Sequence, residues 1–227
     1  MPETIELYSP ILPYPGSMTI VGATFSGKTT LLTKIIKYKK ELFSKVPKTV
    51  VYCYGEHPGD LLREFDDVVY HKGLPSQETL DDWIALYEND GWILCFDDLS
   101  TEFYSNKSSE NLISRVVHHS RLYLIIIGHN LFSNGKHARF ASLNYHSFLL
   151  TRSCRDLNQF AILGRQLFGV GKGQKFVQCY IDATELRPNQ RPGYLFVNTH
   201  PIYSSREGML FTNIFPDEYP QILYKLQ

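Results

Sequence analysis

The residues with the clearest chemical signature form a loop bounded by glycines, Gly22-Ala-Thr-Phe-Ser-Gly27-Lys28-Thr29. This sequence fits the Walker A pattern G-x-x-x-x-G-K-[ST], in which backbone amides and a following helix surround a triphosphate. The spacing predicts that Lys28 reaches the β- and γ-phosphates and that the Thr29 hydroxyl ligates Mg²⁺. We therefore expect an ATP and Mg²⁺ site, and the nucleotide-binding residues are Gly22, Ala23, Thr24, Phe25, Ser26, Gly27, Lys28, Thr29 and Thr30.

Two adjacent carboxylates, Asp97 and Asp98, follow an apolar run at residues 93–96. A triphosphate site of this kind needs an acid on a neighbouring strand, and we expect Asp97 to hold the metal through water or through Thr29. Asp98 is then placed to orient or deprotonate an attacking water, so its expected role is catalytic. The alternative is a polar strand end that caps the next helix. A second acid favours attack by water over transfer to a bound acceptor.

A third polar position follows the apolar run at residues 122–127, where the sequence continues Gly128-His129-Asn130. The carboxyl ends of strands line the ligand crevice of an open α/β sheet. His129 or Asn130 is therefore a candidate to contact the γ-phosphate or the attacking water. Simple loop polarity is the other explanation.

The elements that must position these residues are visible as hydrophobic patterns. Apolar runs that do not alternate with polar residues predict buried strands over 17–22, 49–54, 92–96, 122–127, 147–150 and 194–197. Helical periodicity covers residues 27–42, 76–89, 108–120, 158–168 and 174–184. The sequence therefore predicts an α/β fold, with a mainly parallel sheet and helices on both faces. We expect one domain over 1–227, with an irregular lead-in over 1–16 and a C-terminal extension from about 205 to 227.

Composition excludes several other classes of protein. The 227 residues are 43% hydrophobic, which excludes a disordered chain, and 23 basic residues balance 23 acidic ones. Four scattered cysteines and eight histidines show no metal-ligand spacing, so we expect no metal besides Mg²⁺. The longest apolar run is too short to span a bilayer, and the N-terminus lacks an apolar targeting segment. We expect a soluble intracellular protein with no membrane partner.

A family resemblance rests on six motifs that follow one another along the chain. They are GATFSGKT, WILCFDDL, RLYLIIIGHNLF, LLTRSCRD, GRQLF and GYLFVNTHP. The chain resembles the genome-packaging ATPases of Maverick/Polinton elements and related large DNA viruses, in the FtsK–HerA branch of P-loop ATPases. The similarity runs from about residue 17 to 216 and is most specific over 128–168. It implies a RecA-like (ASCE) core in which a further strand lies between the Walker A and Walker B strands. The family usually has glutamine where this chain has His129, which leaves the sensor open between His129 and Asn130.

The resemblance also implies a function and partners. Such proteins form a homo-oligomeric ring, a pentamer or hexamer, that hydrolyses ATP to move double-stranded DNA into a capsid. The expected partners are DNA and a capsid or portal component, in the host nucleus or a virus factory and transiently at the capsid. An arginine from the neighbouring subunit completes each site and stabilises charge on the transferring phosphoryl group. Arg155 matches the family's Arg-Asp position, Arg139 is the second candidate, and Arg152 and Arg165 also remain open. A surface ion pair between Arg155 and Asp156 explains the same residues equally well.

Other functions fit the sequence less well. A small P-loop kinase would need a lid with clustered arginines and an acceptor site, and Asp98 argues against it. Another translocase or helicase of the same branch usually carries extra domains. Intact Lys28, Thr29, Asp97 and Asp98 argue against a module that binds without hydrolysis.

Basic residues in predicted loops are candidates for DNA contacts. Lys136 with Arg139, and Lys172 with Lys175, each lie beside glycine and could line a pore. Lys34, on the helix after the glycine-bounded loop, belongs to a basic stretch that we expect to be a solvated helix face.

Overall fold

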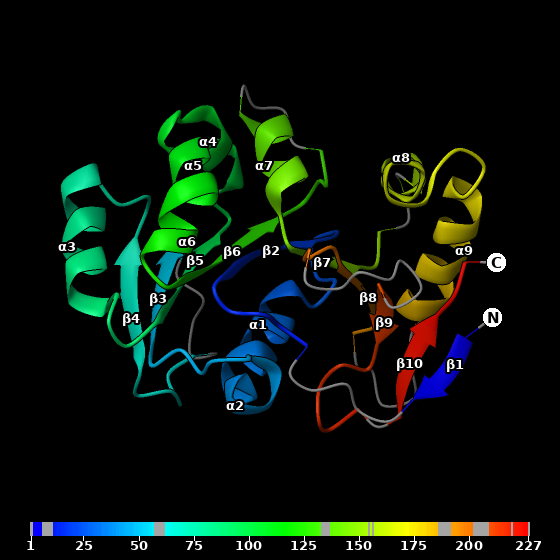
Figure 1. Ribbon diagram of the computed structural model, residues 1–227, viewed down its shortest axis with the longest axis horizontal. Coiled ribbons are helices and arrows are strands. Elements are labelled where there is room, and N and C mark those ends of the chain that lie inside the picture. The colour runs from blue at the N-terminus through cyan, green and yellow to red at the C-terminus, as the bar shows by residue number, and fades with distance from the viewer. Residues whose placement is uncertain are drawn as a thin grey trace.

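The described strands of the computed structural model form a single ten-stranded sheet, in the order β1-β10-β9-β8-β7-β2-β6-β5-β3-β4 (Figure 1). The structure describes residues 2–5, 11–56, 62–132, 137–153, 155, 157–185, 192–201, 209–218 and 220–226. The strands are β1 (Pro2–Ile5), β2 (Gly16–Val21), β3 (Thr49–Tyr54), β4 (Val68–Lys72), β5 (Trp92–Asp97), β6 (Leu122–Gly128), β7 (Ser147–Thr151), β8 (Tyr194–Asn198), β9 (Leu210–Thr212) and β10 (Gln221–Tyr224).

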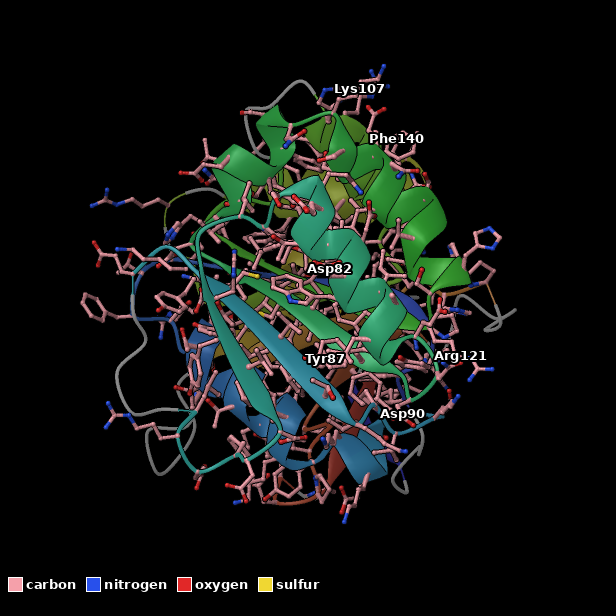
Figure 2. All side chains as sticks on the ribbon, turned by 90° about the vertical axis from the view of Figure 1, so that its left-hand side faces the viewer. Asp82, Tyr87, Asp90, Lys107, Arg121 and Phe140 are labelled. Carbon is pink, nitrogen blue, oxygen red and sulfur yellow. The ribbon has the colours of Figure 1, made fainter. Side chains whose placement is uncertain are left out.

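Helices cover both faces of this sheet. They are α1 (Lys28–Lys37), α2 (Lys39–Leu42), α3 (Gln77–Tyr87), α4 (Ser100–Ser105), α5 (Ser108–Asn111), the π-helical η1 (Leu112–Val116), α6 (Val117–His119), α7 (Ala138–Asn144), α8 (Leu157–Phe168) and α9 (Gly173–Thr184). Figure 1 shows α1 and α2 on one face and α3 to α9 on the other. Figure 2, which looks at the β4 edge, shows α3 in front of the strands with Asp82 and Tyr87 along it.

The six central strands, from β7 to β4, run parallel. Strand β6 pairs with β2 on one side and with β5 on the other, so it lies between the Walker A and Walker B strands. This order confirms the predicted α/β fold class with its inserted strand. On the other side of the sheet, β8, β9, β10 and β1 pair antiparallel.

The apolar strand sequences follow from this two-sided burial. In β5, Leu94 and Phe96 pack into the core under α3 to α9, whereas Ile93 and Cys95 pack into the core that α1 shares. Side chains alternate between the two faces of a strand, so a strand buried on both faces shows no alternation of apolar and polar residues. This arrangement explains the non-alternating runs in the sequence.

The two ends of the chain extend the sheet. Residues 2–5 of the expected irregular lead-in form β1, which pairs with β10. In the C-terminal extension Phe211 and Phe215 are buried against the core that contains α1.

Lys34 of α1 pairs with Asp217 at 3.0 Å and with Glu218, so the expectation that Lys34 belongs to a solvated face is wrong. The C-terminal segment thus packs against the α1 side of its own chain.

Over the described residues, no helix has both the length and the apolar character needed to cross a membrane.

Candidate nucleotide-binding site

The glycine-bounded loop, residues 22–29 and hereafter the phosphate loop, connects the end of β2 to the start of α1. The amide of Gly22 donates to the carbonyl of Gly128 at 3.4 Å, and the amide of Ala23 donates to the carbonyl of Arg152 at 3.3 Å. These bonds hold the loop between the ends of β6 and β7. A Cβ atom on Gly22 would lie 1.8 Å from the Thr151 Oγ1, so only glycine fits there.

Lys28 is buried, and its side chain folds back over the phosphate loop. Its Nζ donates to the carbonyl of Gly22 at 3.0 Å and to that of Ala23 at 2.9 Å. Burial lowers the pKa of Lys28, while the charges of Asp98 and Asp97 act in the opposite direction. The ammonium therefore stands inside the loop, where phosphate oxygens could replace the two carbonyls.

Asp97 ends β5 directly beside the start of α1. Its Oδ2 accepts from the Thr29 hydroxyl at 3.4 Å and from the Tyr52 hydroxyl at 2.5 Å. Burial raises the pKa of Asp97, and the Tyr52 hydrogen bond opposes that rise. The structure thus places the two expected metal-side residues together and adds Tyr52, which the sequence analysis missed.

Asp98 and His129 meet at the ends of β5 and β6. The His129 Nε2 lies 3.4 Å from the Asp98 Oδ1, and both side chains are about half exposed, at 51% and 57%. Asp98 has a φ of +57°, in the left-handed region that side chains rarely adopt. Asn130, the alternative sensor, is also exposed. The predicted catalytic acid and one sensor candidate therefore share the mouth of the site.

Thr151, at the end of β7, anchors the far side of the phosphate loop. Its Oγ1 lies 2.6 Å from the Ser26 hydroxyl and donates to the carbonyl of Val21 at 3.1 Å. The sequence analysis missed Thr151 because no pattern around it marks a ligand. Its only signal is a polar residue at the carboxyl end of an apolar strand.

Comparison with solved structures shows which proteins share this fold. No protein-family model matches the chain, and no curated protein matches it in sequence. The structure is similar to the DNA-packaging ATPase of Sulfolobus turreted icosahedral virus, with TM-score 0.53, 10% identity, and coverage of 82% of this chain and 93% of that one. It is also similar to the genome-packaging NTPase of Sulfolobus turreted icosahedral virus 2, solved with ATP-γ-S, with TM-score 0.51, 12% identity and the same coverage. The chain has the fold of a viral DNA-packaging ATPase.

In this structure, the four arginine candidates occupy two regions. Arg152 and Arg155 follow β7 and both are exposed, and the Arg152 carbonyl accepts from the amide of Ala23 in the phosphate loop. Arg139 lies on α7 and Arg165 on α8, and both are also exposed.

Some of the expected partners cannot be compared with the structure. The alternative ion-pair partner Asp156 and the basic residue Lys136 lie outside the described residues. At the start of α9, Lys175 is exposed and Lys172 is half-buried.

The donor set suits Mg²⁺ and a triphosphate on this fold. The Thr29 hydroxyl and the Asp97 carboxylate are oxygen ligands, which Mg²⁺ prefers, and it keeps several waters besides. Among the residues that the structure describes, no three His, Cys, Asp or Glu side chains are arranged to hold another metal. The remaining nucleotide candidates are all exposed, Ala23, Thr24 and Phe25 along the loop and Thr30 in the first turn of α1.

Proposed function

We propose that this chain is a Mg²⁺-dependent ATPase that acts in a homo-oligomeric ring and moves double-stranded DNA, packaging a viral or transposon genome into a capsid. The observation that carries the proposal is the pair of acids at the end of β5. Asp97 is bonded to Thr29, and Asp98 faces His129. The similarity of the fold to two viral packaging enzymes supports the same assignment.

Each residue has a role in this proposal. Lys28 binds the β- and γ-phosphates, exchanging its two loop carbonyls for phosphate oxygens. Thr29 and Asp97 hold Mg²⁺, which would neutralise charge on the phosphates when bound. Asp98 orients the attacking water and accepts its proton, and His129 or Asn130 contacts the γ-phosphate.

In the proposed ring, each nucleotide site receives one side chain from the neighbouring subunit. We propose that an arginine of the neighbouring subunit stabilises the developing phosphoryl charge, with Arg155 first and Arg139 second. A capsid or portal component is the proposed docking partner of the ring. Lys172 and Lys175, at the start of α9, are the proposed DNA contacts among the described lysines.

The test is the steady-state ATPase rate as a function of protein concentration, with and without long double-stranded DNA. We expect the wild-type rate to rise more steeply than the concentration and to rise again with DNA. Asp98→Asn should lower the rate by about 10²–10⁴-fold, because it removes the base that accepts the proton. Asparagine tolerates the left-handed backbone at this position, so the fold should persist.

Asp90→Asn is the matched control, because Asp90 is an exposed acid that pairs with Lys48 at the surface. It should leave the rate unchanged. A slow rate that is independent of concentration and of DNA would contradict the proposal and favour a small P-loop kinase.

A further inference from the structure

Gln159 is a buried polar residue on α8 to which the proposed function gives no role. Only 6% of its surface is exposed, and its Oε1 accepts from the amide of Leu131 at 2.7 Å. A backbone amide can only donate, so this bond fixes which end of the Gln159 side chain faces Leu131. A buried amide without an acceptor is costly, so the bond fixes the backbone at Leu131 as well. It therefore ties α8 to the segment that contains Leu131.

Leu131 directly follows the two sensor candidates, and we call residues 129–131 the sensor segment. His129 and Asn130 are exposed at the carboxyl end of β6, whereas Leu131 is buried in the core under α3 to α9. On the other side of the sensor candidates, Gly128 is fixed in the sheet by its pairing with Val21. The two candidates thus lie between two fixed points of the backbone, and one of these points is the bond to Gln159.

The start of α8, which carries Gln159, is held against the end of β7 through α9, the helix beside it (Figure 1). Phe160 is fully buried and stacks on Tyr180 of α9, with 4.1 Å between the ring centroids. The Tyr180 hydroxyl donates to the carbonyl of Thr151 at 2.8 Å and accepts from the amide of Ser153 at 2.7 Å. The Thr151 side chain also anchors the phosphate loop. Gln159 therefore connects the sensor segment to the same strand end that shapes the phosphate loop.

A side chain that contacts the γ-phosphate or the attacking water needs an exact position, because misplacement by about 1 Å can lower a rate by about 10²-fold. Half of the His129 side chain is exposed, so its position depends on the backbone that carries it. We propose that Gln159 is a positioning residue for ATP hydrolysis, which holds the sensor segment in place relative to the phosphate loop. This inference rests on the proposed function. Gln159 acts through the sensor and does not itself touch the nucleotide.

The test compares kcat and KM for ATP hydrolysis in Gln159→Met and Gln159→Glu. Methionine keeps the length of glutamine and a high helix propensity, but its thioether is only a weak acceptor. Gln159→Met should therefore lower kcat about tenfold or more, while KM and the dissociation constant for a fluorescent ATP analogue stay within about twofold of the wild type. Glutamate has the same length and offers an oxygen to the Leu131 amide in either protonation state. Gln159→Glu should therefore recover most of the lost kcat.

Gln221→Met is the matched control, because Gln221 is a fully buried glutamine in β10, which β9, β8, β7 and β2 separate from β6. It should leave kcat unchanged. A double-mutant cycle then shows whether Gln159 acts through the sensor. His129→Ala together with Asn130→Ala removes both sensor candidates. Adding Gln159→Met to that background should lower kcat by less than about twofold, because the side chains that Gln159 positions are already absent.

Three results would overturn the inference. They are an unchanged kcat in Gln159→Met, a loss of kcat that Gln159→Glu does not recover, and an effect of Gln159→Met that is as large without the sensor side chains as with them. The last two would mean that Gln159 supports the fold and not the sensor. The comparison of kcat values needs hydrolysis alone, so a wild-type chain that hydrolyses ATP without responding to DNA or to its own concentration would contradict only the proposed function.

Discussion

Tyr52 and Asp97 form a buried hydrogen-bonded pair of side chains in the site. The Tyr52 hydroxyl donates to the same Asp97 oxygen that accepts from Thr29. A donor favours the ionised carboxylate, whereas burial favours the neutral acid. The pair therefore sets the pH at which Asp97 becomes able to hold a cation.

Tyr52→Phe should shift the acid limb of the ATPase pH profile to higher pH. Burial raises the pKa of Asp97, whereas the Tyr52 hydrogen bond, the charge of Lys28 and the Thr29 hydrogen bond lower it, so removing the Tyr52 hydroxyl takes away the largest of the opposing effects. Asp97 is then protonated at a higher pH, and activity is lost earlier as the pH falls. We expect a stability cost of about 1 kcal/mol for the lost hydrogen bond. The measurement is the ATPase rate from pH 5 to 9 (about the range in which enzyme side chains titrate).

Tyr104→Phe is the control for this prediction, because its buried hydroxyl bonds to Tyr145 instead of to an acid. Its acid limb should coincide with that of the wild type. If Tyr52→Phe also leaves the limb in place, Asp97 is not the group that titrates.

At the scale of elements, β7 supports the phosphate loop from the side opposite β6. Thr151 bonds to Ser26 and to the carbonyl of Val21, and it fills the space over Gly22. The loop shape therefore depends on the register between β2 and β7, in which Val21 pairs with Leu150.

Thr151→Val should weaken ATP binding several-fold and lower the free energy of unfolding by about 1–3 kcal/mol. Valine has nearly the same shape but leaves the buried Val21 carbonyl without this donor and Ser26 without its partner. Titration with a fluorescent ATP analogue and urea unfolding measure the two effects.

Thr212→Val, in β9, is the matched substitution. The buried Thr212 hydroxyl has no hydrogen-bond partner among the residues that the structure describes, so its replacement should change neither ATP affinity nor, to any large extent, stability. Equal effects of the two variants would mean that Thr151 acts only through packing.

The elements that the sequence predicted are those with a strong local signal. Strand β2, helix α1 and strand β5 each carry a long apolar pattern next to a motif, and α3 begins with a local signal, because the Ser76 side chain accepts from the amide of Thr79. The π-helical turn η1 lies inside the helix predicted over 108–120. The sequence did not predict this turn, because the apolar spacing of one wider turn does not differ clearly from that of an α-helix. Strands β9 and β10 have three and four residues, which is too few for a strand pattern of apolar residues to be recognised in the sequence.

The site residues that the sequence missed depend on contacts between distant segments. Tyr52 lies 45 residues from Asp97, and Thr151 lies 130 residues from Val21. Only strand order and register bring these pairs together, and neither follows from a local pattern. The Walker A loop was predictable because its ligands are consecutive and begin a helix.

At the scale of the whole molecule, a histidine cluster lies at the end of the sheet opposite the phosphate loop. His146 precedes β7, and its ring lies 4.8 Å from that of His200 and 5.4 Å from that of His118, centroid to centroid. The His146 Nδ1 accepts from the amide of Ser17 at 3.0 Å, at the start of β2. Since an acceptor nitrogen carries no proton, this bond requires the neutral ring in its Nε2-protonated tautomer.

The cluster predicts that stability falls as the pH drops from about 6.5 toward 4. Burial, together with the charges of His200 and His118, lowers the pKa of His146 to about 4. The unfolded chain binds that proton near pH 6.5, so between these values the unfolded state holds more protons and acid favours it. The lowered pKa of His200 acts in the same direction. Urea unfolding at several pH values measures the slope.

His146→Asn isolates the contribution of this ring, because its Oδ1 can still accept from the amide of Ser17 and it does not titrate. The variant should lose up to one proton from the slope of unfolding free energy against pH, while its stability near pH 7 changes little. The raised pKa of Asp97 stabilises the folded state toward acid and is common to both proteins, so it cancels in the comparison. Equal slopes would contradict the prediction, because they would show that His146 takes up its proton in the folded protein as readily as in the unfolded chain. The burial of the ring and the two neighbouring histidines are the reasons to expect a difference.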